Sequence, residues 1–222
     1  MTLVSAHRCL SPADIEAAIA LGADYVEFDV QRCGDGSLVL HHDPVDAPPP
    51  GALAYDVALD LLAGRAKAHL DLKFEGDEVP VVARAVDRLG SDDLLVTTLH
   101  DDAVRAIRDW ADAEGHPLEV GLSLGRGVRR SRLWESLQIL STELFPGVRY
   151  HLSGANVVVA HHWLARIRVR RFARRHRLPL VVWTVDTPEA LAYWMRPGRA
   201  WMVTTNAPEI ALGLRSPDRL SP

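Results

Sequence analysis

The sequence predicts a single (β/α)8 TIM barrel over residues 1–222, with a β-hairpin after the second strand and no sizeable insertion subdomain. Three observations predict this class. Short β-rich runs alternate with helical stretches from one end of the chain to the other, which indicates a parallel sheet. Eight such strand–helix units are present, and 222 residues is within the size range of one closed barrel.

An open, doubly wound sheet is the alternative architecture for alternating strands and helices. It gives no reason for eight units of nearly equal length, so we prefer the closed barrel. No Pro/Ser-rich linker divides the chain, and one domain is therefore expected.

The first unit illustrates how the elements are assigned. Leu3–Arg8 is rich in apolar and β-forming residues and is predicted to be the first strand. Pro12–Leu21 follows as a helix, because Ser11 is a favourable N-cap and proline is favoured at the first helical position. Gly22 closes this helix, as glycine often does at a helix C-terminus.

The second strand, Asp24–Arg32, is expected to continue into a hairpin arm. Residues 33–36 read Cys-Gly-Asp-Gly, and Ser37–His42 is again extended. A glycine-containing turn between two extended runs predicts that they pair. A Pro-rich loop then occupies residues 44–51.

The rest of the chain is assigned from the same patterns. Strands are expected at His69–Phe74, Leu94–Leu99, Leu118–Leu124, Ala155–Ala160, Leu180–Val185 and Trp201–Thr205. Helices are expected at Val57–Lys67, Glu78–Leu89, Asp102–Glu114, Val128–Leu144, Trp163–Arg177, Pro188–Met195 and Pro208–Leu214.

The composition is that of an ordinary globular protein, with 48% hydrophobic and 24% charged residues. The net charge of -4 argues against a general nucleic-acid binder. Arginines cluster between Arg166 and Arg177 at helical spacing, which we interpret as a solvated helix face.

Targeting signals are absent from the sequence. No apolar run reaches the roughly 18 residues that a membrane-spanning helix needs, and the chain start has neither a basic region nor a cleavage site. We therefore expect no transmembrane segment and a cytoplasmic location. Cys9 and Cys33 do not make a disulfide framework and are expected to be free thiols. Nothing in the sequence indicates an oligomeric state.

Candidate site residues lie near the ends of the first strands, where barrel active sites are found. Glu27 and Asp29 are two residues apart on one strand, so their side chains face the same side, while Phe28 faces the helices. Two inward carboxylates repel each other and are costly to desolvate. A divalent cation removes that cost, and oxygen ligands favour Mg²⁺ or Ca²⁺.

The next strand repeats this spacing with Asp71 and Lys73. Asp71 is a candidate third metal ligand, and Lys73 is expected to pair with a carboxylate or a phosphate oxygen. The alternative is that these are ordinary charges held by salt bridges at strand ends. Two inward pairs on adjacent strands, with histidines beside them, favour the metal site.

His7 and His42 are candidate acid–base residues, because histidine exchanges protons near neutral pH. Strand alternation lets only one of His41 and His42 face the site, and the pattern alone does not choose between them. Trp183 is a candidate wall of the site, with core packing as an equal alternative. The sequence contains no zinc signature and no Gly-rich phosphate loop followed by Lys and Ser or Thr.

Three segments share their pattern with a known family: Ala6-His7-Arg8, the run from Gly22 to Val30, and the run from Asp35 to Pro44. They resemble the glycerophosphodiester phosphodiesterase family. The family patterns there are HRG, G-A-D-x-[IV]-E-x-D-V and D-G-x-[LV]-V-x-H-D. The order and spacing match over about 40 residues. Weaker similarities are Leu70-Asp71-Leu72-Lys73, the run from Val182 to Asp186 beside W-T-V-N, and the run from Val203 to Pro208 beside T-D-x-P.

The resemblance implies a function and assigns roles. It places His42 rather than His41 at the H-D position, with His7 and His42 as the general acid/base pair. Glu27, Asp29 and Asp71 would hold Mg²⁺ or Ca²⁺. Arg8 and Lys73 would contact the phosphate of a small-molecule phosphodiester substrate. The reaction implied is hydrolysis of a glycerophosphodiester to glycerol 3-phosphate and an alcohol.

The sequence also departs from the family pattern. Cys9 stands where the family has glycine, and Ser11-Pro12-Ala13-Asp14 replaces P-E-N-T, so a glutamate near the metal is missing. Asp71 replaces a glutamate. The connection from Pro44 to Ala68 is short, whereas many family members insert a subdomain there that helps to recognise glycerol.

These departures keep two other functions open. One is a related lipid phosphodiesterase, similar to lysophospholipase D and sphingomyelinase D, which lack the insertion. The other is a non-catalytic barrel that binds a phosphorylated ligand or partner. Both histidines and three carboxylates are present in the sequence, which favours an enzyme.

Overall fold

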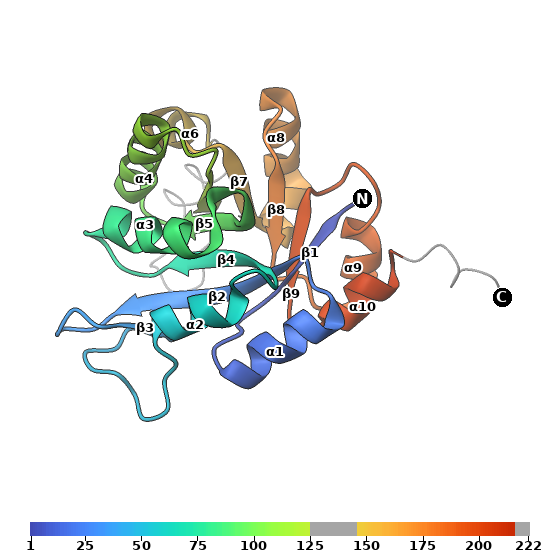
Figure 1. The fold of residues 1–222 in the computed structure, drawn as a ribbon. Coiled ribbons are helices and arrows are strands. Elements are labelled where there is room, and N and C mark those ends of the chain that lie inside the picture. The colour runs from blue at the N-terminus through green and yellow to red at the C-terminus, as the bar shows by residue number, and fades with distance from the viewer. Residues whose placement is uncertain (125–145, 216–222) are drawn as a thin grey trace, which may run out of the picture.

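The computed structural model describes residues 1–124 and 146–215, which form a closed ring of parallel strands surrounded by helices (Figure 1). The barrel strands are β1 (Leu3–Ala6), β2 (Tyr25–Arg32), β4 (Lys67–Leu72), β5 (Leu94–Thr98), β6 (Glu119–Leu124), β7 (Val157–His161), β8 (Leu180–Trp183) and β9 (Met202–Thr205). β1 pairs in parallel with both β2 and β9, which closes the ring. The predicted barrel is confirmed.

The predicted hairpin is also present. β3 (Leu38–Leu40) pairs antiparallel with the end of β2, with Val30 opposite Leu40, and lies outside the ring. Gly36 occupies the turn at φ 84°, a conformation that favours glycine. Because β3 is outside, β2 and β4 become neighbours in the barrel.

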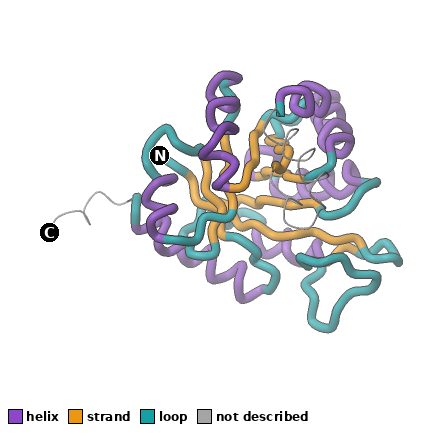
Figure 2. Tube along the Cα trace, turned by 180° about the vertical axis from the view of Figure 1, so that it is seen from behind, coloured by secondary structure: helices purple, strands orange, loops and turns teal. Residues whose placement is uncertain are grey.

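Helices cover the outside of the strands, as Figure 2 shows from behind. They are α1 (Pro12–Leu21), α2 (Tyr55–Leu62), α3 (Glu78–Leu89), η1 (Ser91–Asp93), α4 (Asp101–Glu114), α6 (Gly147–Ser153), α7 (His162–Leu164), η2 (Ala165–Val169), α8 (Arg170–His176), α9 (Pro188–Trp194) and α10 (Pro208–Gly213). The expected helix Val128–Leu144 lies outside the described residues. None of the helices in the described ranges combines the length and the apolar composition that a membrane-spanning helix requires.

Local signals explain where α1 starts and stops. α1 begins with a capping box, in which the Ser11 hydroxyl accepts from the Asp14 amide at 3.2 Å and the Asp14 carboxylate accepts from the Ser11 amide at 3.0 Å. Gly22 ends it at φ 75°. The expected helix Val57–Lys67 is wrong at both ends, because α2 starts at Tyr55 and a turn with Gly64 at φ 69° stops it at Leu62.

Two further boundaries differ from the expectation. α6 was not predicted, because it is a short helix that begins after Pro146 without a side-chain cap. The expected continuous helix Trp163–Arg177 is divided into α7, η2 and α8, since η2 has π-helical bonding. Cys9 and Cys33 are both buried and free, as predicted.

The barrel lumen is apolar near one end and polar near the other. A buried cluster inside it consists of Tyr25, Leu95, Val157, Val159, Val181 and Met202. Tyr25 precedes Glu27 and Asp29 at alternate positions of β2, so all three face the same way. The carboxylates therefore lie towards the carboxyl ends of the strands, where barrel active sites form.

Gly121 of β6 is a tight point in this lumen. A Cβ added there would lie 2.4 Å from Cγ2 of Val159 and 3.3 Å from Cγ2 of Thr97. We expect Gly121→Ala to lower the free energy of unfolding by about 1–3 kcal/mol through overpacking, measured by urea denaturation. Adding Val159→Ala opens the space, so the double variant should lose less than the sum of the single losses. Strict additivity would show that this contact is not the cause.

Candidate active site at the carboxyl ends of the strands

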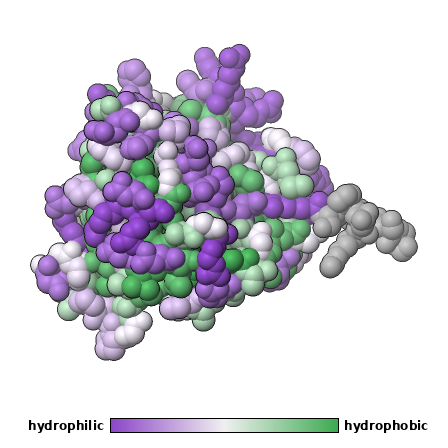
Figure 3. Space-filling model, viewed as in Figure 1, coloured by the Kyte–Doolittle hydropathy of each residue, from purple (hydrophilic) through white to green (hydrophobic). Residues whose placement is uncertain are grey.

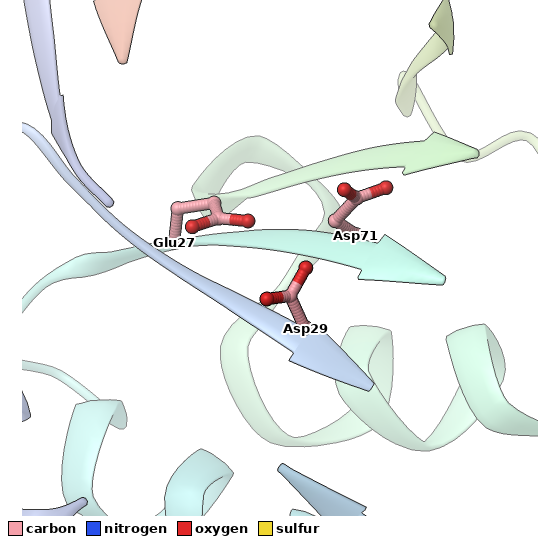
Figure 4. A group of neighbouring side chains, drawn as sticks. All are labelled: Glu27, Asp29 and Asp71. Atoms are coloured by element: carbon pink, nitrogen blue, oxygen red, sulfur yellow. The ribbon is translucent and has the colours of Figure 1, made fainter. Parts of the chain in front are cut away.

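Three buried carboxylates converge at one end of the barrel (Figure 4). Glu27 and Asp29 come from β2 and Asp71 from β4, and the parallel register sets Asp29 opposite Asp71. One oxygen from each lies within 4.8 Å of the others. Two oxygens bound to one Ca²⁺ at about 2.3–2.6 Å are at most about 5 Å apart, so the spacing fits a single divalent cation.

The electrostatics of this group also favour a cation. Burial, followed by repulsion from Asp29 and Asp71, raises the pKa of Glu27 to about 8. In the absence of a metal, Glu27 therefore holds a proton at neutral pH. A bound cation supplies the positive charge that would let all three carboxylates ionise together.

Lys73 partly neutralises the same group. It follows β4, and its ammonium group lies 2.5 Å from Oδ1 of Asp29 and also contacts Asp71. Its side chain is nearly as buried as those carboxylates. Of the two partners predicted for Lys73, the structure shows the carboxylate.

His42 lies directly beside the carboxylates. Its Nδ1 is 3.0 Å from Oδ2 of Asp29. Its Nε2 is 2.7 Å from Nη2 of Arg8. His41 does not share this environment, because its Nδ1 contacts the backbone oxygen of Asp43 at 2.8 Å. The chain thus turns one of the two adjacent histidines into the site and the other away from it.

His7 is held by a side-chain network from the last two strands. Its Nδ1 is 2.9 Å from Oδ1 of Asn206, and Nδ2 of Asn206 donates to Asp186 at 2.8 Å. A carboxylate accepts only from the amide nitrogen, so the amide oxygen must face His7. His7 therefore carries its proton on Nδ1, and its Nε2 points towards Glu27, 3.9 Å from Oε2.

Asn206 and Asp186 lie in two of the segments that carry the family resemblance, but neither is predicted from the sequence to be a site residue. The signal was present in the two short segments, because W-T-V-N appears here as Trp183-Thr184-Val185-Asp186, and T-D appears as Thr205-Asn206. An amide and an acid have exchanged places relative to the family pattern. Only the structure shows that the two residues touch.

Arg8 has an uncommon backbone conformation. Its φ of 57° is in the left-handed region, which non-glycine residues rarely adopt. This turn directs its backbone amide to Oε2 of Glu27 at 2.6 Å. Cys9 then donates its backbone amide to the carbonyl of Glu27 at 2.9 Å. The turn at Arg8 thus fixes both the side chain and the backbone of Glu27, a candidate metal ligand.

A cavity of about 20 Å³ lies among these residues, which is enough for one water molecule or ion. It is lined by His7, Glu27, His69, Asp71, Thr97, Ser123, Val159, Trp183 and Thr204. Trp183 is half-buried, and its ring meets His161 edge-on at 5.4 Å. Of the two alternatives that the sequence left open for Trp183, a wall of the site or core packing, the structure shows the side chain in the lining of this cavity.

His69 lies beneath the carboxylates and was not predicted. Its ring nitrogens lie 3.1 Å from Oγ of Ser5 and 3.1 Å from Oγ1 of Thr97. Burial lowers its pKa to about 4, so the ring is neutral. It forms a polar floor under the site without adding charge.

The segment that replaces P-E-N-T does not reach the site. Asp14 uses its carboxylate in the capping box of α1 and is exposed to solvent. Cys9 is buried, and burial raises the pKa of its thiol to about 12. Among the described residues, the only cluster of three or more His, Cys, Asp or Glu side chains that could hold a metal ion is Glu27, Asp29 and Asp71.

Comparisons with known proteins agree on one family. A family profile described as "Glycerophosphoryl diester phosphodiesterase family" matches residues 11–47. A curated "Glycerophosphodiester phosphodiesterase" from Caldanaerobacter subterraneus subsp. tengcongensis is 35% identical over 105 residues. The match covers 43% of this chain and 43% of that protein, so it spans less than half of the relative's length.

Solved structures share the whole fold at low sequence identity. A glycerophosphodiester phosphodiesterase from Agrobacterium tumefaciens has a TM-score of 0.72 at 19% identity, covering 97% of this chain and 99% of its own. A phosphodiesterase from Oleispira antarctica, in complex with the product sn-glycerol-3-phosphate, has a TM-score of 0.69 at 16% identity and covers 97% of both chains. At these identities the likeness concerns the fold.

Proposed function

We propose that this chain is a glycerophosphodiester phosphodiesterase, as the matches to that family's profile and to its curated member support. It would hydrolyse glycerophosphodiesters to glycerol 3-phosphate and an alcohol with one divalent cation, Mg²⁺ or Ca²⁺. The observation that carries this proposal is the convergence of three buried carboxylates beside His7 and His42. The product complex of the Oleispira antarctica phosphodiesterase supports the substrate class.

The cation would be held by Glu27, Asp29 and Asp71, whose oxygens have suitable spacing. When bound, it would neutralise the phosphate and the charge that develops in the transition state. Asp29 also contacts His42 and Lys73. Asp29 therefore connects the proposed metal ligands with His42, one of the two proposed acid–base residues.

The two imidazoles would exchange the protons of the reaction at Nε2, since Nδ1 of His7 faces Asn206 and Nδ1 of His42 faces Asp29. One ring takes the proton from the attacking hydroxyl, which we propose is the substrate's own glycerol hydroxyl. The new P–O bond then forms as the bond to the alcohol breaks. The other ring protonates the leaving alcohol oxygen. Hydrolysis of the resulting cyclic phosphate by water gives glycerol 3-phosphate.

Arg8 is the better placed of the two proposed phosphate contacts. Its side chain is 45% exposed, and its guanidinium group lies against His42. Lys73 is buried between two carboxylates. It would therefore contact only a phosphate oxygen that lies beside the proposed metal ligands. Trp183 would form the opposite wall of the substrate site.

The network behind His7 gives a specific prediction. Asn206→Leu removes the acceptor for Nδ1 and should lower kcat by about 10- to 100-fold, the usual cost of losing an orienting hydrogen bond. Asn206→Asp should also impair the enzyme, because it sets two carboxylates face to face at the present 2.8 Å contact. The swapped pair, Asp186→Asn with Asn206→Asp, restores a donor and an acceptor and should recover most of the loss.

The measurements are steady-state kcat and the ¹⁵N NMR shifts of the His7 ring, which distinguish a protonated Nδ1 from a protonated Nε2. Melting curves control for folding. If the swapped pair were as inactive as Asn206→Asp while remaining folded, the orienting role would be refuted.

The substrate assay tests the proposal directly. Purified protein is incubated with glycerophosphocholine or glycerophosphoethanolamine and Mg²⁺, Ca²⁺ or EDTA, and glycerol 3-phosphate is measured. We expect release only with the metals. A lysophospholipid is included because the loop from β3 to α2 is short, with only 14 residues between Leu40 and Tyr55. Turnover of that substrate alone would favour a lysophospholipase D-like activity.

A further inference from the structure

The outer side of α7, η2 and α8 concentrates positive charge on an acidic protein. Residues 162–185 contain seven arginines and no aspartate or glutamate, whereas the whole chain has a net charge of -4. Figure 3 shows hydrophilic side chains gathered over α8, at the top of that view. Within the described part of the chain, Arg171, Arg174 and Arg175 form no ion pair and are exposed.

Two large apolar side chains are exposed on the same segment. Trp163 is 52% exposed and Ile167 is 58% exposed. Together with Arg171 and Arg175 they are spaced four residues apart, and Ala165, Val169 and Ala173 are buried on the opposite side. We call the exposed stripe of Trp163, Ile167, Arg171, Arg174 and Arg175 the basic face. Its first part is apolar and its second part is cationic.

A groove of about 460 Å³ borders the basic face, between α6 and α8. Its lining includes Val148, Phe172, Arg168, Arg171 and Arg175. Val148 is largely exposed, and Phe172 packs on Tyr150 with ring centroids 5.3 Å apart. The groove thus combines an apolar floor with guanidinium groups, a combination that matches the chemistry of a phospholipid headgroup and its first methylenes.

The apolar end of the basic face adjoins the mouth of the barrel. Trp163 follows His161 and His162 at the end of β7. His161 packs against Trp183, which lines the cavity with the carboxylates. A surface that contacts Trp163 and Ile167 would therefore lie next to the proposed active site.

We propose that the basic face docks this protein on an anionic lipid surface. Guanidinium groups attract anionic headgroups, and a tryptophan with an aliphatic neighbour suits the headgroup–acyl boundary. Nucleic acid would account for the arginines but not for the exposed Ile167 on the same stripe. Docking requires no turnover, so the test of docking is independent of the test of the proposed hydrolysis.

Binding is tested by co-sedimentation of the whole protein with vesicles of phosphatidylcholine alone or of equal parts phosphatidylcholine and phosphatidylglycerol. We expect binding to the anionic vesicles that weakens with salt. Each basic residue near such a surface strengthens binding by about fivefold. Arg171→Glu with Arg175→Glu should therefore weaken binding by about 25-fold or more. Trp163→Ser should remove the binding that persists at high salt.

The matched control is Arg65→Glu with Arg84→Glu, which changes the net charge equally. Those arginines lie on the α2–α3 side of the barrel, and their surface ion pairs with Glu16 and Asp56 are worth little. The control should bind like the original chain, and both double variants should hydrolyse soluble glycerophosphocholine equally. The proposal fails if both variants bind alike, if anionic vesicles are not bound, or if duplex DNA is bound in preference to them. Melting curves verify that each variant is folded.

Discussion

His42→Ala will lower kcat for glycerophosphodiester hydrolysis by about 10²- to 10⁴-fold, the usual contribution of a general acid or base. The imidazole lies between Asp29 and Arg8, so its removal takes away a proton carrier at the centre of the proposed site. The side chain is 39% exposed, and the loss of packing should be small. The assay is release of glycerol 3-phosphate at saturating substrate and metal.

His41→Ala is the matched control, because it removes the same group one residue away. His41 contacts a backbone oxygen outside the carboxylate group, and its loss should leave kcat within about threefold, the effect of a modest surface change. Equal losses in the two variants would contradict the assigned orientation. A fully active His42→Ala would remove His42 from the mechanism.

Mg²⁺ or Ca²⁺ will raise the melting temperature relative to EDTA by about 8–16 °C when the metal is about 1,000-fold above its Kd. The physical reason is the repulsion among Glu27, Asp29 and Asp71, of which Lys73 offsets only part. Calorimetric melts with and without metal measure the change. A melting temperature that does not respond to either ion would argue against the site.

The metal effect should depend on pH in a defined direction. The folded, metal-free protein holds the Glu27 pKa at about 8, above its ordinary 4.5. Between these values the folded state binds more protons than the unfolded state, so stability in EDTA should fall as pH rises. Metal must displace that proton below about pH 8, and its affinity should rise by up to about tenfold per pH unit towards that value. Stabilisation by metal should therefore be larger at pH 8 than at pH 6.

Glu27→Gln separates this effect from general pH dependence. Glutamine keeps an oxygen acceptor for the Arg8 amide but carries no titrating proton. In EDTA, the stability of the variant should decrease much less as the pH rises than that of the original protein. The variant should also bind metal more weakly. An unchanged pH slope would assign the titration to another group.

The convergence of the three carboxylates was predictable because it depends on regular structure. Strand alternation set Glu27 and Asp29 on one face, and the parallel neighbour brought Asp71 beside them. This prediction needed only the order of the strands in the barrel. The expected strand His69–Phe74 is shifted by two residues from β4, Lys67–Leu72. This error did not affect the prediction, because the spacing of Asp71 and Lys73 is the same in either case.

The residues that surround this group were less predictable because they lie beyond strand ends. His41 and His42 follow β3, where alternation no longer applies, and the choice depended on the resemblance. The left-handed turn at Arg8 is specified by contacts with Glu27, which is 19 residues away. The link from His7 to Asn206 spans 199 residues, and no local pattern reports such a pairing.

The contact between His7 and Asn206 joins the first and last strands of the barrel, so it can form only late in synthesis. All three carboxylates and both proposed catalytic histidines are synthesised within the first third of the chain, from His7 to Asp71. The ring closes only when β9 pairs with β1, and Asn206 reaches His7 at the same step. During synthesis on the ribosome, a nascent chain therefore carries its chemical groups long before it can orient them. An incomplete chain should not have a working site, because the last strand both seals the barrel and sets the first histidine.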